Sequence, residues 1–373
     1  MAGKVVKTAV VGLGTVGSIH AQWCATVPES RLVAVCDADE RRAQEVARTY
    51  GVDFHSDYEA VLDRSDVDAV IIATPNHLHA DIAIAAVRAG KHIAVEKPLC
   101  TTLEDAETMI AAVRESGVKA QYFENLCFSP AYHTAKEIVD RGGLGNIVFV
   151  RCCENSGTGG FGDTVLGLES VARVSGEAAV MSWLRDPVRA GGGMLLTTGC
   201  HSITYIYHLL GRPKPERVYA ELVPDGARLE AAAYVTIRFS DGRVAWVDSS
   251  ATHALGGFDD RAEIYGTRGT VFLDLYRSTG IKVFSQEGYG DIGQSAFALI
   301  PSETTNWSHP IVDERWSLGY EAELRHFLCC VRDDSDPSVT LDDGKLTLKI
   351  VLAAYEAGRT HKSVEMSEAS TGR

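Results

Sequence analysis

The sequence lacks the features that mark several large classes of protein. Its nine cysteines occur singly or as the adjacent pairs Cys152-Cys153 and Cys329-Cys330, and no two have C-x-x-C spacing. Neither a disulfide framework nor a zinc knuckle is expected, and no metal site is predicted. Positive charge is scarce, because 36 Lys and Arg stand against 50 Asp and Glu and give a net charge of −14. This balance disfavours nucleic acid and anionic membrane surfaces as partners.

Long apolar segments are missing as well. The longest uncharged stretch, residues 190–211, contains three glycines near its start, two histidines, three threonines and a serine, so we do not expect it to span a membrane. Residues 1–7 lead directly into a strand-like run, with no apolar targeting region and no cleavage site. We therefore expect a cytoplasmic protein.

The chain is long enough for two hydrophobic cores. It has 373 residues, of which 45% are hydrophobic and 23% charged, a composition typical of folded globular proteins. In the first third, short β-branched runs alternate with helical patterns, which predicts βαβ units and a parallel sheet. The predicted strands are residues 5–11, 31–36, 69–73, 92–95 and 119–122.

The second half has a different pattern. Strand-like runs at 234–239 and 243–249 are joined by the turn Ser240-Asp241-Gly242, which predicts a mostly antiparallel sheet. The Gly-, Ser- and Thr-rich segment 156–181 is typical of a binding lid, with a surface excursion as the alternative. Two helices are predicted near the end, at about 317–331 and 342–357, and no regular structure after Ser363.

A glycine-rich loop follows the first predicted strand. Gly12-Leu13-Gly14-Thr15-Val16-Gly17 matches G-x-G-x-x-G, between an apolar run and a helical segment. Gly12 permits the tight turn, Gly14 lets backbone N–H groups approach a pyrophosphate, and Gly17 allows close helix packing. The helix N-terminus adds partial positive charge. The loop therefore predicts a dinucleotide site.

An acidic residue completes this pattern. Asp37 lies twenty residues after Gly17, at the end of the second predicted strand, where its carboxylate can accept hydrogen bonds from ribose hydroxyls. Asp37 and Asp39 would repel a 2′-phosphate, so NAD is favoured over NADP. Arg41 and Arg42 follow closely and leave NADP as the less favoured alternative.

Further segments carry recognisable motifs. They are Ala73-Thr74-Pro75-Asn76-His77-Leu78-His79, Glu96-Lys97-Pro98, Asn125-Leu126-Cys127-Phe128-Ser129-Pro130, the segment from Gly191-Gly192-Gly193 to His201, and Glu263-Ile264-Tyr265-Gly266-Thr267. Together they resemble the Gfo/Idh/MocA oxidoreductases, the glucose-fructose oxidoreductase and inositol dehydrogenase family. The resemblance implies an N-terminal Rossmann NAD-binding domain at 1–126 and an α+β domain for substrate binding and oligomerisation at 127–373, built on a mostly antiparallel open sheet. The helix at about 342–357 is a candidate to pack back on the first domain.

The resemblance also implies roles for individual residues. Lys97 and His201 are implied as catalytic residues, and the partner as a homodimer or homotetramer. The predicted cofactor-binding residues are Gly12, Gly14, Thr15, Val16, Gly17, Asp37, Thr74, Pro75, Asn76, His79, Glu96, Lys97 and Asn125. The predicted substrate-binding residues are Lys97, Tyr122, Trp183, Arg185, Thr197 and His201. Asn76 and His79 could also serve as helix caps, and Tyr122, Asn125, Trp183 and Arg185 as packing residues.

The sequence departs from the family pattern at two points. Thr197 stands where relatives usually have an aspartate, four residues before His201, and a threonine cannot supply a charge to the imidazole. His201 would then act with another partner, Lys97 would carry more of the proton transfer, or activity or substrate would differ. Leu126-Cys127 replaces the arginines of many relatives, which predicts a substrate without an anionic group at that point.

The favoured function is oxidation of a ring secondary alcohol. A buried lysine amine can accept the hydroxyl proton, and an indole beside a guanidinium suits a polyhydroxylated ring, so we expect a sugar, glycoside or cyclitol as substrate. Two alternatives stay open. One is a redox-assisted glycosidase that retains its NAD, and the other is a non-catalytic sensor of NAD or sugar.

Overall fold

The computed structural model describes residues 5–155, 182–251, 259–274, 283–285, 306–308 and 318–366. The chain divides into two compact units, each described here by itself. The first unit contains residues 1–128, 188–191 and 319–348, and the second contains 129–187, 192–318 and 349–373. The predicted lid, 156–181, lies outside the described residues.

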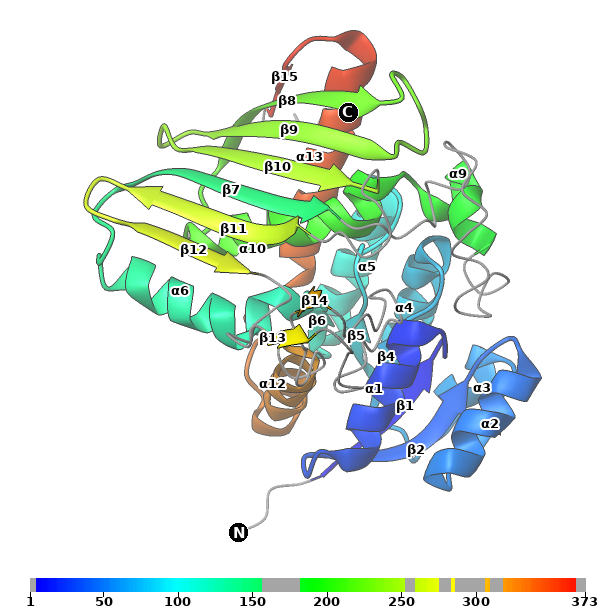
Figure 1. The fold of residues 1–373 in the computed structure, drawn as a ribbon. Helices are drawn as coiled ribbons and strands as arrows, with labels where there is room; N and C mark the ends of the chain where they lie inside the picture. The colour runs from blue at the N-terminus through cyan, green and yellow to red at the C-terminus, as the bar shows by residue number, and fades with distance from the viewer. Residues whose placement is uncertain are drawn as a thin grey trace. The chain divides into compact units, whose positions relative to one another are not determined.

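The first unit is built on a parallel sheet (Figure 1). Its strands are β1 (Val6–Val11), β2 (Ser30–Cys36), β3 (Asp53–His55), β4 (Ala69–Ile72), β5 (His92–Val95) and β6 (Ala120–Tyr122). They pair in the order β3-β2-β1-β4-β5-β6. In this order the strands are added outward from β1 on one side and from β4 on the other. This is the strand order of the Rossmann fold.

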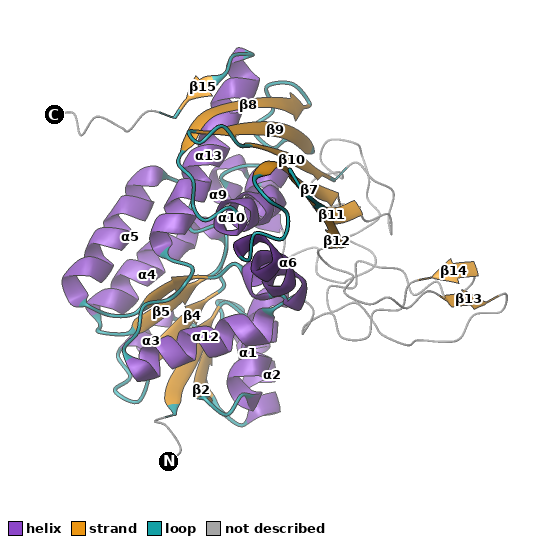
Figure 2. Ribbon diagram, turned by 90° about the vertical axis from the view of Figure 1, so that its left-hand side faces the viewer, coloured by secondary structure: helices purple, strands orange, loops and turns teal. Residues whose placement is uncertain are grey.

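Helices cover both faces of this sheet (Figure 2). They are α1 (Thr15–Thr26), α2 (Glu40–Tyr50), α3 (Tyr58–Leu62), α4 (His79–Arg88), α5 (Leu103–Ser116) and α12 (Tyr320–Asp333), with short 3-10 turns η1 (Asn76–Leu78) and η2 (Asn125–Phe128). Side chains fix several starts, since Asp39 and Thr102 accept the N–H groups of Arg42 and Asp105 at the first turns of α2 and α5. The predicted stop at Gly90 is present, with φ +72° just after α4.

The second unit is built on a seven-stranded sheet. Its strands are β7 (Ile147–Asn155), β8 (Pro215–Val223), β9 (Ala232–Phe239), β10 (Val244–Ser250), β11 (Asp259–Gly266), β12 (Thr270–Asp274) and β15 (Val364–Glu365). They pair in the order β12-β11-β7-β10-β9-β8-β15, with β7 and β10 parallel and the other pairs antiparallel. A separate pair joins β13 (Val283–Ser285) and β14 (Asn306–Ser308). The predicted fold class, a Rossmann domain with a mostly antiparallel α+β domain, is confirmed.

The remaining helices include the segment that carries His201. They are α6 (Pro130–Asp140), η3 (Ser182–Arg185), α9 (Pro187–Ala190), the π-helix η4 (Leu195–Gly199), α10 (Cys200–Leu209) and α13 (Leu341–Thr360). Ser129 caps α6 by accepting the N–H of Tyr132, and Pro130 takes its first turn. Across the described ranges, no helix has the length and apolar character needed to cross a membrane.

Candidate functional site

The strand register brings three predicted motifs to one edge of the first sheet. Val11 at the end of β1 is aligned with Ile72 of β4, and Ile72 is aligned with Val95 of β5. The loops that begin at Gly12, at Ala73 and at Glu96 therefore leave the sheet side by side. This edge lies at the carboxyl ends of the parallel strands, at the point between β1 and β4 where the strand order reverses. It is the place where open α/β sheets bind ligands.

The glycine loop has no space for side chains at its two ends. Gly12 has φ +89°, and a Cβ there would lie 2.5 Å from the carbonyl oxygen of Ala73. A Cβ on Gly17 would lie 1.9 Å from the carbonyl oxygen of Gly12. Gly14 precedes the first turn of α1, and no side chain caps this helix N-terminus. The turn thus leaves backbone N–H groups and the positive end of the helix dipole for an anionic group.

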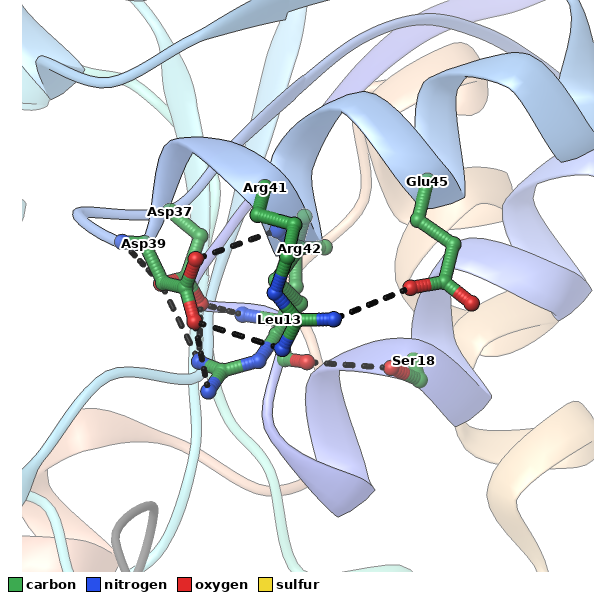
Figure 3. Close-up of polar contacts among 7 residues, drawn as sticks. All are labelled: Leu13, Ser18, Asp37, Asp39, Arg41, Arg42 and Glu45. Atoms are coloured by element: carbon green, nitrogen blue, oxygen red, sulfur yellow. Dashed lines mark hydrogen bonds and ion pairs between the residues drawn. The ribbon is translucent and has the colours of Figure 1, made fainter.

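Asp37 ties the end of β2 to the glycine loop (Figure 3). One carboxylate oxygen accepts the N–H of Leu13 at 2.8 Å, and the other accepts the N–H of Asp39 at 2.8 Å. The Arg42 guanidinium donates to both oxygens at 3.1 Å. Arg41 lies between two carboxylates, 3.9 Å from that of Asp39 and 3.8 Å from that of Glu45, with its side chain 78% exposed. The Asp37 carboxylate therefore stands beside the glycine loop, as the sequence predicts, with a guanidinium already in contact with it.

His79 connects the loops that follow β4 and β5. Its ring nitrogens lie 2.9 Å from the carbonyl oxygen of Pro98 and 2.8 Å from that of Thr74. The side chain is buried, and burial lowers the pKa of this imidazole. Since Pro98 directly follows Lys97, this link holds the backbone of the predicted catalytic lysine to the neighbouring loop.

Asn76 does not act as a helix cap. It is the first residue of η1, where Pro75 occupies the capping position, and Leu78 occupies it for α4. The buried Asn76 amide instead donates to the carbonyl oxygen of Ala190 at 2.8 Å, 114 residues further along the chain. Local sequence favours capping, but this tertiary acceptor takes the amide.

The Glu96 carboxylate holds the backbone of Lys97. Its Oε2 accepts the backbone N–H of Lys97 at 3.0 Å, and its Oε1 lies 2.7 Å from Nε2 of the fully buried His20. Two further carboxyls, Glu124 and Glu323, are fully buried in the same unit. Burial, with the nearby charges of Glu96 and Glu124, raises the pKa of Glu323 well above its ordinary value.

In the second unit, Thr197 lies within the π-helix η4 and His201 in the first turn of α10. The regular helix expected from the sequence is thus widened at Thr197, and such π-turns are frequent at functional sites. His201 is 5% exposed. The next residue, Ser202, donates to Oε1 of Glu154 on β7 at 2.5 Å. This bond holds the start of α10 on the sheet.

The other predicted residues lie in several environments. Trp183 is half-buried and Arg185 exposed, both in η3 of the second unit. Tyr122 is fully buried in the first unit, where a Cβ on Gly344 would lie 3.0 Å from its ring, so packing surrounds this side chain. Asn125 is buried at the start of η2.

Sequence reasoning missed a glutamate that holds the triple-glycine segment. Glu230 is fully buried and accepts the N–H of Gly193 at 3.0 Å and that of Leu195 at 2.7 Å. The Tyr355 hydroxyl donates to it at 3.3 Å. Burial raises the pKa of Glu230 to about 7. The one sequence signal for Glu230 is its charge, two residues before the apolar strand β9. Charged residues are too common near strand ends for this signal to single out Glu230.

Comparison with known proteins agrees with this geometry over both halves of the chain. A family profile described as "Oxidoreductase family, NAD-binding Rossmann fold" matches residues 6–124. Its companion, "Oxidoreductase family, C-terminal alpha/beta domain", matches residues 136–366. The chain belongs to the Gfo/Idh/MocA oxidoreductase family, and the predicted enzyme class, an NAD-dependent oxidoreductase, is confirmed.

Relatives match nearly the whole chain. The NAD(+)-dependent scyllo-inositol 2-dehydrogenase of Bacillus subtilis is 31% identical, over 97% of this chain and 96% of its own length. The myo-inositol 2-dehydrogenase of Thermotoga maritima is 26% identical, over 97% and 99%. Among solved structures, GenD2 from gentamicin A biosynthesis, in complex with NAD, is 27% identical with a TM-score of 0.86, covering 99% of this chain and 98% of that one.

The residues of the first unit fit NAD. Backbone atoms occupy the space that a Cβ would need at Gly12 and at Gly17. The loop therefore has no side chains at these positions, and a pyrophosphate can approach its backbone closely. The Asp37 carboxylate has the place and charge expected for a ribose diol, and its charge disfavours a 2′-phosphate. NAD is thus the cofactor, as the sequence predicts.

Proposed function

We propose that this chain oxidises a ring secondary alcohol of a cyclitol or sugar, with Lys97 and His201 in proton transfer. The single observation that carries the proposal is the position of Lys97 two residues after β5, at the same sheet edge as the glycine loop. NAD, when bound, supplies the hydride acceptor. The inositol 2-dehydrogenases among the relatives support a polyol substrate.

Lys97 acts as the base in this proposal. Its backbone is held on two sides, because Glu96 accepts its N–H and His79 binds the carbonyl of Pro98. A fixed backbone limits where the amine can reach, and accurate placement is a large part of catalytic power. The amine accepts the hydroxyl proton as the carbinol carbon loses its hydride.

His201 is the second proton-transfer residue. Thr197 provides a hydroxyl where relatives usually provide a carboxylate, so the imidazole here lacks that charged neighbour. We infer that Lys97 carries the larger share of the proton transfer in this chain. His201 orients the hydroxyl and passes the proton on.

The substrate is inferred to be uncharged. Leu126 and Cys127 are buried at the positions where many relatives have arginines, so no cation is present there to pair with an anionic substrate. Trp183 and Arg185, two residues apart in η3, provide an indole face and a guanidinium for the ring and its hydroxyls.

The test uses the whole protein with NAD and a panel of scyllo-inositol, myo-inositol, aldoses and glycosides. We expect NADH absorbance to rise with at least one cyclitol or sugar, and product mass to fall by two hydrogens. Lys97→Ala should abolish turnover while NAD affinity stays within about threefold, since the loop and Asp37 are untouched. Lys119→Ala, which removes a lysine that pairs with Asp334 and Asp336 elsewhere in the first unit, is the matched control.

Three outcomes would contradict the proposal. Near wild-type turnover by Lys97→Ala would remove this amine from the mechanism. Release of an aglycone without net NADH would indicate a redox-assisted glycosidase. NAD binding without turnover of any substrate in the panel would favour a sensor.

A further inference from the structure

The triple glycine of the second unit is shaped by two side chains that no motif contains. A Cβ on Gly193 would lie 2.3 Å from the carbonyl oxygen and 2.4 Å from the carboxylate Oε2 of Glu230. A Cβ on Gly192 would lie 2.2 Å from the Tyr355 hydroxyl. Glycine is therefore required at both positions because Glu230 and Tyr355 occupy the space of a side chain.

Glu230 satisfies the backbone at the start of the helical segment. A helix begins with N–H groups that have no partner within the helix, and an acceptor must come from elsewhere. Glu230 accepts two of them, from Gly193 and Leu195, and its own carbonyl accepts the N–H of Met194 at 3.1 Å. The Tyr355 hydroxyl shares the N–H of Gly193 at 3.1 Å. Carboxylate charge at this end also complements the helix dipole.

The segment fixed in this way carries His201, a predicted proton-transfer residue, and Thr197, a predicted substrate-binding residue. Leu195 begins η4, Thr197 lies two residues later, and η4 continues directly into α10 with His201. Thr197 donates its backbone N–H to the carbonyl of Gly193 at 3.0 Å, so the held glycine is bonded directly to Thr197. Displacement of Gly193 would therefore displace Thr197 and the first turn that bears His201.

We propose that Glu230 is a positioning residue, which holds the helix start so that Thr197 and His201 keep their reactive placement. The proposal rests on the proposed function for the importance of His201. Glu230 lies outside the known motifs, between β8 and β9, and it acts through backbone rather than through substrate. Tyr355 of α13 assists by holding the same N–H and the same carboxylate.

Three variants of the full chain separate the contributions of these contacts. Glu230→Ala removes both acceptors, Glu230→Gln keeps one oxygen for Leu195, and Tyr355→Phe removes the hydroxyl alone. Glu263→Gln is the matched control, a buried glutamate on β11 of the same unit, bonded to Tyr265. Amide hydrogen exchange of peptides covering 192–201 is measured with kcat for scyllo-inositol and myo-inositol and with the Kd for NAD.

We expect exchange in 192–201 to accelerate in the order Glu263→Gln, Tyr355→Phe, Glu230→Gln, Glu230→Ala. The kcat of Glu230→Ala should fall about a hundredfold, which is the cost of displacing a reactive group by about 1 Å. Glu230→Gln should restore most of this loss, and NAD affinity should not change. A merely structural role would lower the amount of folded protein and leave kcat per folded molecule unaltered.

The exchange measurement also has a pH signature. The titratable group that touches Glu230 among the described residues is Tyr355, whose pKa burial raises well above its usual value, so Tyr355 stays neutral. Protection of 192–196, corrected for intrinsic exchange, should therefore rise in wild type between about pH 6 and pH 8 as the carboxylate ionises and accepts both N–H groups more strongly. The same protection should be independent of pH in Glu230→Gln.

Two results would overturn the proposal. Unchanged exchange in both Glu230 variants would show that the carboxylate does not hold the segment. Accelerated exchange with unaltered kcat would show that this placement does not serve the reaction. If wild type turned over neither inositol, the cyclitol part of the proposed substrate class would fail, while the exchange data would still decide whether Glu230 holds the helix start.

Discussion

We propose that the choice of cofactor depends on Asp37. Its carboxylate holds the N–H groups of Leu13 and Asp39 and at the same time contacts the guanidinium of Arg42. A ribose diol can donate hydrogen bonds to this carboxylate in place of the arginine, whereas the negative charge of the carboxylate would repel a 2′-phosphate. Arg42 thus has two effects. It offsets part of the charge of Asp37, and its guanidinium would be available to bind a phosphate if Asp37 were removed.

We predict that Asp37→Ser weakens NAD binding at least about tenfold, because hydrogen bonds to an ionised acceptor contribute about 1.5–3 kcal/mol each. NADP binding should improve relative to NAD, because Arg42 is then free to meet the 2′-phosphate. The measurement is the Kd of both cofactors by titration. Asp66→Asn is the control, since Asp66 pairs with Arg64 elsewhere in the first unit. An unchanged ratio of the two affinities in Asp37→Ser would contradict this role.

Single residues also mark how far the sequence alone could lead. Gly12, Gly17 and Asp37 were predictable because each does its work within about 25 residues of chain, through local turns and spacing. Asn76 and Glu230 were not, because their partners, Ala190 and the Gly193 segment, are distant in sequence. A polar side chain with a distant backbone partner leaves no periodic signal.

At the scale of elements, strands and helices with strong patterns were well predicted. Residues 92–95 form β5 as expected, and the last two helices lie within a few residues of their predicted bounds. The three-residue strand β3 was missed, and the tail after Ser363, expected to lack regular structure, pairs as β15 with β8. Such short strands are stabilised by pairing with neighbouring strands, and they contain too few residues to show a hydrophobic pattern. The same holds for the π-helix η4, which has five residues and begins next to backbone bonded to Glu230 and Tyr355.

Glu323 on helix α12 should make the stability of the protein depend on pH. Burial raises the pKa of Glu323 in the folded chain well above its ordinary value, so between the unfolded and folded pKa values the folded chain keeps a proton that the unfolded chain releases. The unfolded state therefore binds fewer protons in this window, and stability from this group falls as pH rises through it. Glu323→Gln should flatten the fall in melting temperature between about pH 5 and pH 8. Glu321→Gln, a half-exposed glutamate on the same helix, should not. Equal slopes in the two variants would argue against a protonated Glu323.

For the whole molecule, chain order and compact units do not coincide. Residues 319–348 join the first unit although the second unit's residues precede them. Leu324, Phe327 and Leu328 of α12 are fully buried in the same core as Val10 and Ile71 of the parallel sheet. The sequence predicts this helix but not which sheet it covers, since any apolar face can pack on any other. The Rossmann unit is thus incomplete until nearly the whole chain is present.

Phe327→Ala tests this dependence. The ring of Phe327 packs edge-to-face on Phe123, with centroids 6.1 Å apart, so its removal leaves a cavity and should destabilise the first unit by about 3–5 kcal/mol. Urea unfolding measures the loss, and hydrogen exchange locates it, with faster exchange expected in 6–124. Arg325→Ala is the control on the same helix, because its ion pair with Glu29 is half-exposed and should contribute less than about 1 kcal/mol. If the two variants lost equal stability, or if exchange rose only in 129–251, α12 would not be a part of the first unit's core.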